Sequence, residues 1–275
     1  MCEHETDVKS MTESSYAMWT DADAYEAYVG RWSRVAAVEF LDWLGVAPQS
    51  AWLDVGCGTG ALAQTILRCH DPSRVDAFDL SPAFIEEAAS KTNDSRATFR
   101  IADAGALPSA DASFDAVVSG LMLNAAPDQP RALSEFVRAA RQGGIVGTYV
   151  WDFDGEMQML RRFWEAANAL DPEADRDRDV SGFAICKPDR LKEAFTEARL
   201  RDVEVRAIDA PTLFRDFDDY WKPFLRGPAP APTHVRSLSE AKRTELRERI
   251  RAGLPIAADG SIPMIARAWA AKGIK

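Results

Sequence analysis

Residues 53–60 read Leu53-Asp54-Val55-Gly56-Cys57-Gly58-Thr59-Gly60, and this stretch determines how the rest of the chain is interpreted. The apolar run 51–55 predicts a buried strand, and three alternate glycines then turn the chain into a helix that begins near Ala61. Glycine permits positive φ angles and a close approach of the backbone, which a side chain would block. The start of the following helix favours a carboxylate or a phosphate. The stretch therefore predicts a strand-to-helix turn that holds a ligand.

Short apolar runs alternate with amphipathic helices on both sides of this turn. Strands are predicted at 51–55, 75–78, 97–101, 114–119 and 145–151, and helices at 33–45, 60–69, 82–91 and 129–141. This alternation predicts a parallel sheet with helices on both faces. Ligands of such sheets bind outside the carboxyl ends of the strands, which is where the glycine turn lies.

The glycine spacing fits more than one cofactor. Gly56-x-Gly58-x-x-Ala61 satisfies the loose fingerprint of a dinucleotide-binding turn, and Asp79 follows about 20 residues later, where a ribose-binding acid belongs. An NAD-dependent oxidoreductase is therefore one interpretation. Asp54 before the first glycine and the additional Gly60 favour a different adenosyl cofactor.

The motifs resemble those of the class I S-adenosylmethionine (SAM)-dependent methyltransferases, in the order of that family. The glycine stretch resembles motif I. The later matches are Asp76-Ala77-Phe78-Asp79-Leu80-Ser81 for motif II, Ile101-Ala102-Asp103-Ala104 for the third strand, Ser113-Phe114-Asp115-Ala116-Val117-Val118-Ser119 for motif IV, and Arg141-Gln142-Gly143-Gly144 for the turn into the fifth strand. The subgroup is similar to the ubiquinone and menaquinone C-methyltransferases (methyltransferase type 11-like). The resemblance implies a Rossmann-like, seven-stranded, mostly parallel sheet with an antiparallel last strand.

The resemblance implies SAM as the cofactor and S-adenosylhomocysteine as its product. Gly56 and Gly58 would approach the methionine part of SAM. Asp79 would bridge the ribose hydroxyls, Leu80 would pack on adenine, and Asp103 would accept a hydrogen bond from the adenine amino group. The full set of expected cofactor-binding residues is Arg31, Asp54, Gly56, Cys57, Gly58, Gly60, Asp79, Leu80, Asp103, Ala104 and Ser119.

Two of these positions lie apart from the glycine turn. Arg31 would meet the methionine carboxylate, and the region of Ser119 would line the floor below the sulfonium. In related enzymes the aromatic segment around Arg31 forms a helical lid over SAM, whereas the simpler alternative is that its rings pack on the sheet edge. Both interpretations remain open at this point.

Aromatic side chains from both ends of the chain predict an apolar acceptor pocket. Asn124 follows the fourth predicted strand, where amino-methyltransferases acting on adenine or glutamine carry an Asn-Pro-Pro-aromatic motif that this chain lacks. The competing interpretation of each aromatic residue is a place in the core. The candidate substrate-binding residues are Tyr16, Trp19, Tyr25, Tyr28, Asn124, Trp151, Trp221 and Phe224.

We expect a single methyltransferase domain over residues 1–275, because neither a repeat nor a clear linker interrupts it. Beyond residue 151 the pattern predicts helices at 156–170, 188–198 and 239–252, and strands at 202–208 and 262–269. The expected parts are an N-terminal helical lid (1–48), a SAM-binding half (49–151) and a substrate-side half (152–275). The last part carries a helical insertion at about 211–255, before the final strand.

Composition limits the partners and the chemistry. The net charge of −10 disfavours nucleic acid and anionic membranes, and no apolar run approaches the roughly 20 residues of a membrane span. Four scattered cysteines and three scattered histidines form no metal-binding pattern, and the acidic N-terminus does not resemble a secretory signal, so we expect no metal and a cytoplasmic location.

No residue is assigned as a catalytic acid or base. A sulfonium methyl group is already activated, so the protein mainly has to align an acceptor behind it and exclude water. The expected function is transfer of a methyl group to a small-molecule acceptor. The alternatives are the NAD-dependent oxidoreductase and a protein that binds SAM without transferring a methyl group.

Overall fold

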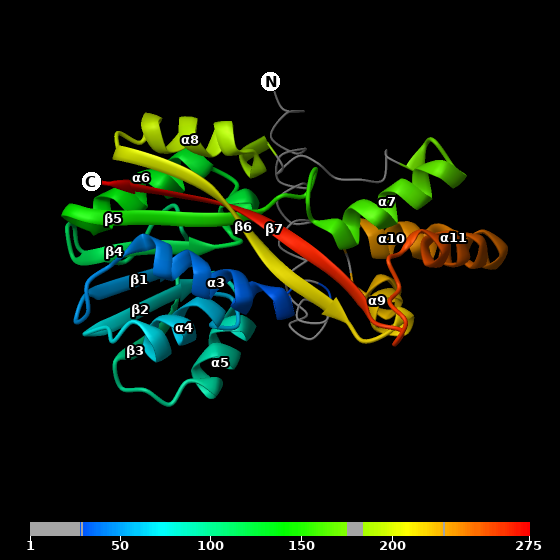
Figure 1. The fold of residues 1–275 in the computed structure, drawn as a ribbon. Coiled ribbons are helices and arrows are strands. Elements are labelled where there is room, and N and C mark those ends of the chain that lie inside the picture. The colour runs from blue at the N-terminus through cyan, green and yellow to red at the C-terminus, as the bar shows by residue number, and fades with distance from the viewer. Residues whose placement is uncertain (1–27, 29, 175–183, 228) are drawn as a thin grey trace, which may run out of the picture. The chain divides into compact units, whose positions relative to one another are not determined.

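The computed structural model describes residue 28 and residues 30–174, 184–227 and 229–275. Internal contacts group the chain into two compact units (Figure 1). The sheet unit comprises residues 33–151, 182–208 and 268–275, and the helical unit comprises residues 1–32, 152–181 and 209–267. Two long strands continue from one unit into the other, and the expected single domain stays a prediction.

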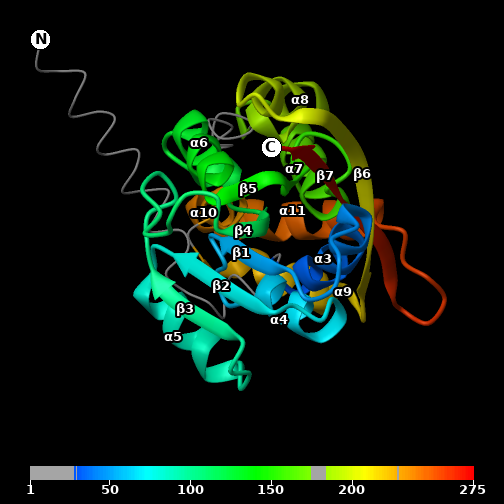
Figure 2. The same cartoon turned by 90° about the vertical axis from the view of Figure 1, so that its left-hand side faces the viewer.

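The described part of the chain forms one sheet of seven strands, in the order β3-β2-β1-β4-β5-β7-β6 (Figures 1 and 2). The strands are β1 (Ala51–Val55), β2 (Arg74–Asp79), β3 (Ala97–Ile101), β4 (Phe114–Gly120), β5 (Ala140–Trp151), β6 (Arg201–Phe214) and β7 (Ile262–Ile274). Strands β1 to β5 pair in parallel, and β7 pairs antiparallel with β5. The predicted seven-stranded sheet with an antiparallel last strand is confirmed.

Helices cover both faces of this sheet, as predicted (Figure 2). One face carries α3 (Arg31–Leu44), α4 (Ala61–Cys69) and α5 (Pro82–Lys91), and the other carries α6 (Gln129–Ala139) and α8 (Pro188–Glu197). The apolar side of α3 packs closely on β5, because a Cβ at Gly147 would lie 2.9 Å from Leu44 Cδ2 and 3.1 Å from Phe40 Cζ. Burial of such apolar faces is the main stabilisation of the helices.

Three strands are longer than their sequence pattern predicts. β5 begins at Ala140, β6 continues to Phe214, and β7 continues to Ile274. The segment 141–144, predicted as a turn, lies inside β5, and the preceding helix ends at Ala139 because Ala140 pairs with Phe114. Backbone pairing with a neighbouring strand supplies these extensions and does not require alternating side chains.

The helical unit is built around aromatic rings. Its described elements are α7 (Gln158–Leu170), α9 (Phe217–Trp221), the 3₁₀ helix η5 (Lys222–Leu225), α10 (Pro230–Ser237) and α11 (Glu240–Gly253). Phe163 stacks on Phe224 with ring centroids 4.6 Å apart, and the hydroxyl of Tyr220 donates to Met159 O at 2.8 Å. The predicted helical insertion between β6 and β7 is confirmed, with its elements between residues 217 and 253.

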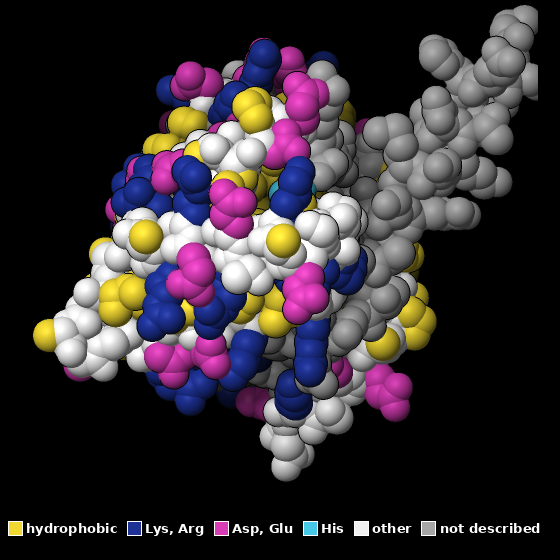
Figure 3. All heavy atoms as spheres, turned by 90° about the vertical axis from the view of Figure 1, so that its right-hand side faces the viewer, with side chains coloured by type: hydrophobic (Ala, Val, Ile, Leu, Met, Phe, Trp, Pro, Cys, Tyr) yellow, Lys and Arg dark blue, Asp and Glu magenta, His cyan; other side chains and the backbone are white. Residues whose placement is uncertain are grey.

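Charges on the surface of this unit are mixed. Basic and acidic side chains lie interspersed on the face in Figure 3. On α11, Arg247 contacts Glu248 at 2.7 Å and Asp218 at 3.7 Å, and the guanidinium of Arg251 lies 5.4 Å from the ring centroid of Phe217. None of the helices in the described ranges has the length and apolar character needed to cross a membrane.

Candidate cofactor-binding site

The glycine turn lies where the connections of the sheet change direction. From β1 the chain proceeds to β2 on one side, and from β4 it proceeds to β5 on the other. β1 and β4 are neighbours, with Asp54 opposite Val118. Ligands of open α/β sheets bind at such a switch point, outside the carboxyl ends of the strands.

The three glycines hold the backbone in a conformation that other residues rarely adopt. Gly56, Gly58 and Gly60 have φ angles of 72°, 54° and 88°. The amides of Gly56 and Cys57 donate to Phe78 O at 2.7 and 2.9 Å, which anchors the turn to the end of β2. Among the described residues, no atom beyond the chain neighbours of Gly58 lies within 4 Å of a Cβ built there, so none of these residues covers the backbone at this position. A ligand can approach this part of the turn directly.

Asp54 stabilises the start of the helix that follows the turn. Its side chain is fully buried, and its Oδ2 accepts a hydrogen bond from the amide of Ala63 at 3.0 Å. Gly60 precedes α4 and has no side chain to cap it, so Asp54 provides the missing cap from the adjacent strand. Burial raises the pKa of Asp54 to about 8, against the opposing effect of the Ala63 amide. A direct contact of Asp54 with cofactor stays a prediction.

Asp79 connects the ends of β1 and β2. Its Oδ2 accepts from the amide of Gly58 at 2.9 Å, and its Oδ1 accepts from the amide of Ser81 at 2.9 Å. Burial raises the pKa of this carboxyl group, and the two amides partly oppose that effect. The side chain is half-buried, so it is held by the turn and also reaches the surface.

Two large apolar side chains are exposed beside this acid. Leu80 is 41% exposed, and Ile101, which pairs with Asp79 in the sheet, is 55% exposed. Exposed apolar residues at a ligand-binding edge are suited to contact a flat ring. Leu80 is the residue that the sequence predicts to pack on adenine. Ile101 lies within the third-strand motif but was not assigned, because its exposure follows from its place at the end of an edge strand.

Asp103 lies in the turn after β3, next to the end of β2. The amide of Ala102 donates to Asp79 O at 3.0 Å, which ties the two segments together. Asp103 is exposed, and its Oδ1 accepts from the amide of Gly105 at 2.8 Å. The structure thus brings together the glycine turn, Asp79, Leu80, Asp103 and Ala104 through hydrogen-bonded neighbouring segments.

The segment after β4 completes this edge of the sheet unit. Leu121 has a φ of 61°, and its amide donates to Tyr149 O at 2.8 Å. The Met122 side chain lies against the glycine turn, since a Cβ at Gly56 would be 2.2 Å from Met122 Cγ. Sequence reasoning missed Met122, because the contact depends on the path of a loop that has no motif.

Two predicted residues of this segment differ in accessibility. Ser119 is fully buried in β4, and its Oγ has no hydrogen-bond partner within the described chain. Asn124 is half-buried in a single 3₁₀ turn, η2 (Leu123–Ala125). Their expected places at the cofactor and the acceptor stay predictions.

Cys57, within the glycine turn, is not set up for nucleophilic chemistry. Its side chain is buried, and burial together with the charges of Asp54 and Asp79 raises the pKa of the thiol. The reactive form of cysteine is the thiolate, which these surroundings disfavour. The expected contribution of Cys57 is therefore that of its backbone.

The remaining predicted residues fall into several groups. Trp151 is buried at the end of β5 in the sheet unit, whereas Trp221 and Phe224 are buried in the helical unit. Tyr28, in the helical unit, contacts Phe224 edge-on at 5.8 Å. Roles of these rings in substrate binding stay predictions. Three expected residues lie outside the described residues: Tyr16, Trp19 and Tyr25.

Arg31 is also held in the helical unit. Its Nη1 donates to Asp219 Oδ1 at 3.0 Å, and its guanidinium lies 4.4 Å from the ring centroid of Trp32 and 4.7 Å from that of Phe214. Its Nε and Nη2 are buried without a hydrogen-bond partner in the described structure. The predicted contact of Arg31 with the methionine carboxylate of SAM stays a prediction.

These features fit an adenosyl cofactor. No described residue fills the space beside Gly58, which fits the close approach of a ligand to the backbone. The half-buried carboxylate of Asp79 supplies acceptors suited to ribose hydroxyls, and Leu80 supplies an exposed apolar surface. The residues that would hold SAM in the sheet unit are therefore the glycine turn, Asp79, Leu80 and Asp103.

Comparison with known proteins agrees with this geometry. Residues 53–147 match a family model described as a methyltransferase domain. An O-methyltransferase of Pyrenophora dematioidea is 33% identical over 224 residues, which cover 72% of this chain and 77% of the relative. A demethylmenaquinone methyltransferase of Roseiflexus castenholzii is 32% identical over 168 residues, which cover 57% of this chain and 70% of the relative.

Other matches are shorter or concern the fold alone. The match to uncharacterized mycobacterial relatives spans 40% of this chain and 40% of their length. The crystal structure of a putative methyltransferase from Bacillus halodurans superposes with a TM-score of 0.58, covering 87% of this chain and 98% of that one at 16% identity. Fold, site and relatives together show that the chain belongs to the class I SAM-dependent methyltransferases.

Proposed function

We propose that this protein transfers the methyl group of SAM to a small-molecule acceptor by direct in-line displacement. One observation carries the proposal: the Asp79 carboxylate accepts a hydrogen bond from the amide of Gly58, where no described residue covers the backbone. A carboxylate suited to ribose hydroxyls thus lies beside a glycine that no described side chain covers. This arrangement matches the binding of an adenosyl cofactor at the switch point of the sheet.

SAM supplies an electrophilic methyl group when it is bound. In the proposal, Asp79 binds the ribose, Leu80 and Asp103 hold the adenine, and the glycine turn accommodates the methionine part. Holding donor and acceptor in line supplies most of the acceleration, so the protein needs no dedicated acid or base. An acceptor with an acidic hydroxyl or carbon would gain from a base, and none is assigned.

A small acceptor is supported by the named relatives and by charge. One relative is named for an O-methylation and the other for demethylmenaquinone, so the class of acceptor differs between them. The net charge of −10 disfavours a nucleic-acid acceptor. The free thiols of Cys57, Cys69 and Cys186 are typical of a reducing compartment, which supports the proposed cytoplasmic location.

Ligand-induced stabilisation tests the cofactor. A ligand that binds only the folded protein raises the unfolding temperature, increasingly as its concentration exceeds the dissociation constant. We expect S-adenosylhomocysteine to stabilise the protein and NAD to leave it unchanged. The reverse result would identify a NAD-dependent oxidoreductase and reject the proposal.

An Asp79 variant tests the site. Asp79→Ala is expected to weaken S-adenosylhomocysteine binding by about 1.5–3 kcal/mol, the cost of losing charged hydrogen bonds. Asp76→Asn is a matched control on the same strand, because Asp76 Oδ1 accepts from Thr98 Oγ1 instead of from the glycine turn. Equal affinities of both variants in calorimetric titration would contradict the assignment of Asp79.

Methyl transfer itself is tested by release of S-adenosylhomocysteine. Acceptors of several classes, including hydroxylated aromatic compounds and carboxylic acids, are incubated with the protein and SAM. Acceptor-dependent release supports the enzyme. If the protein binds SAM tightly but releases no S-adenosylhomocysteine with any acceptor of a broad panel, the result favours a SAM-binding protein that transfers no methyl group.

A further inference from the structure

The turn after β3 fixes one oxygen of the Asp103 carboxylate. Asp103 Oδ1 accepts from the amide of Gly105 at 2.8 Å, and the amide of Ala106 donates to Asp103 O at 3.0 Å. Within the described chain, no hydrogen bond involves Oδ2 of Asp103. The orientation of this free oxygen therefore depends on how firmly Gly105 is held.

Gly105 is held from helix α6 by Arg131. The Nε of Arg131 donates to Gly105 O at 2.7 Å, so the amide of Gly105 contacts Asp103 and its carbonyl contacts Arg131. The arginine side chain also packs closely on this glycine. A Cβ at Gly105 would be 3.3 Å from Arg131 Cδ and 3.4 Å from Arg131 Nε. Asp128 caps α6 by accepting from the amide of Arg131 at 2.9 Å, which anchors the arginine backbone.

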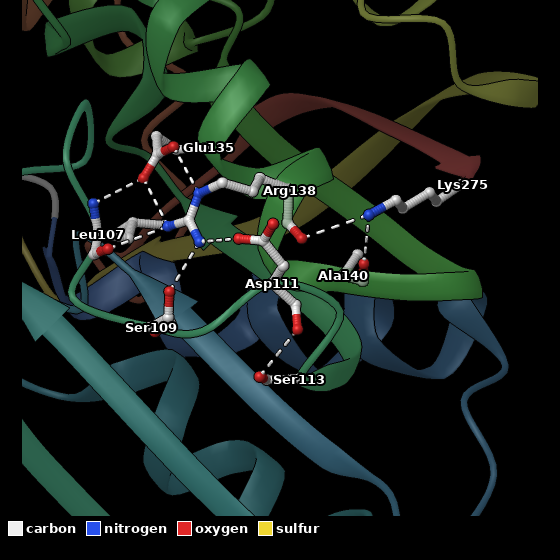
Figure 4. Close-up of polar contacts among 8 residues, drawn as sticks. All are labelled: Leu107, Ser109, Asp111, Ser113, Glu135, Arg138, Ala140 and Lys275. Carbon is white, nitrogen blue, oxygen red and sulfur yellow. Dashed lines mark hydrogen bonds and ion pairs between the residues drawn. The ribbon is translucent and has the colours of Figure 1, made fainter.

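The rest of the same loop is attached to α6 independently (Figure 4). Arg138 Nη1 donates to Ser109 O and to Asp111 Oδ1, both at 2.7 Å, and Glu135 Oε2 accepts from the amide of Leu107 at 2.8 Å. Loss of Arg131 would therefore release the turn 103–106 while residues 107–111 stay attached. The contact of Arg131 acts locally on Asp103.

We propose that Arg131 is a positioning residue for adenine recognition: it fixes the Gly105 turn and thereby aims the Asp103 carboxylate at the amino group of adenine. This inference rests on the proposed function, in which Asp103 binds that group. A hydrogen bond weakens steeply when its angle departs from linearity, so a loose turn binds the amino group less well. Arg131 itself needs no contact with the cofactor.

Adenine-dependent binding tests the inference. S-adenosylhomocysteine is compared with its analogue in which hydrogen replaces the 6-amino group of adenine, so that this edge of the ring carries no donor. Calorimetric titration is made with the wild type, Arg131→Ala, Arg131→Lys and Asp103→Ala. Chemical denaturation of each variant confirms that it is folded and measures its stability.

Arg131→Ala is expected to weaken S-adenosylhomocysteine binding about three- to tenfold, the size of one hydrogen-bond contribution. Binding of the analogue that lacks the amino group should change less than about twofold, because its ring has no donor for Asp103. The ratio of the two affinities, which measures the preference for the adenine amino group, therefore falls in Arg131→Ala. Arg131→Lys retains a donor that reaches Gly105 O and should keep most of the preference.

The outcomes separate this inference from the proposed function. A wild type that binds no S-adenosylhomocysteine rejects both. If Asp103→Ala leaves the preference unchanged, Asp103 does not bind the amino group and the inference fails with it. If Asp103→Ala removes the preference and Arg131→Ala preserves it, only the role of Arg131 is rejected. Equal weakening of both ligands by Arg131→Ala would mark a general structural role and also reject it.

Discussion

Asp54 shows how a single side chain shapes the glycine turn. It replaces the cap that Gly60 cannot provide, and it does so from a fully buried position. Burial without a compensating cation disfavours the charged carboxylate and raises its pKa to about 8. Asp79 adds to this effect through its charge. A carboxyl group in such surroundings is protonated at neutral pH.

This raised pKa predicts a pH-dependent stability. Between the unfolded value near pH 4 and the folded value of about 8, the unfolded chain binds fewer protons, so the free energy of unfolding decreases as the pH rises. Asp54→Asn does not titrate and should remove this component. Urea denaturation of both proteins from pH 4.5 to about 8.5 measures the difference, and parallel profiles would contradict the prediction.

A substitution at Gly58 is expected to affect both the stability of the turn and the binding of the ligand. The methyl group of an alanine at this position meets no atom of the other described residues within 4 Å, but the backbone must adopt a φ of 54°. Gly58→Ala is therefore expected to cost about 1–2 kcal/mol of stability and, in addition, to weaken S-adenosylhomocysteine binding, because the methyl group occupies the open space above the turn.

Gly45 provides a matched control. It has a φ of 68°, and a Cβ there would also meet no described atom beyond its chain neighbours within 4 Å, but it lies after α3. Gly45→Ala should lose a similar free energy of unfolding and bind S-adenosylhomocysteine normally. If both variants bind the ligand equally well, the space above Gly58 is not part of the site.

At the scale of elements, α6 holds the loop between β3 and β4, a connection without a helix of its own. Arg138 and Glu135, one helical turn apart on α6, bond to each other and to this loop (Figure 4). The pairing raises the pKa of the arginine and lowers that of Glu135, so both stay charged at neutral pH. A long irregular segment is thereby kept in one conformation.

Removal of this contact should destabilise the loop and the protein. Arg138→Ala is expected to lower the free energy of unfolding by about 1–2 kcal/mol and to increase hydrogen exchange at residues 107–111. Arg190→Ala removes an exposed pair with Glu193 on α8 and should leave the stability nearly unchanged. Equal stabilities of the two variants would show that the Arg138 network contributes only as much as a surface ion pair.

For the whole molecule, the long strands β6 and β7 determine how unfolding proceeds. Each contributes residues to the sheet unit and to the helical unit. Unfolding of either unit therefore disrupts strands that the other unit needs. We expect one cooperative transition in scanning calorimetry, with equal calorimetric and van't Hoff enthalpies. Two separate transitions would contradict the single domain predicted from the sequence.

Local patterns account for the parts of the fold that were predicted well. The bounds of β1, β3 and α5 agree with the sequence pattern to the residue. For β1 the signal is a largely apolar, buried run, and for α5 it is the preceding cap Ser81, whose hydroxyl accepts from the amide of Phe84. The predicted lengths of β5, β6 and β7 were wrong, because pairing between distant segments extends these strands beyond their side-chain pattern.

Local sequence patterns predict the glycine turn, the acids Asp54 and Asp79 and the succession of strands and helices along the chain, since backbone sterics, capping and hydrophobic periodicity act over a few neighbouring residues. The contacts of Met122 with Gly56 and of Arg131 with Gly105 arise only in the folded structure. These contacts join residues 66 and 26 positions apart. Their partners are selected by the packing of loops and helices around the sheet, which no local pattern encodes.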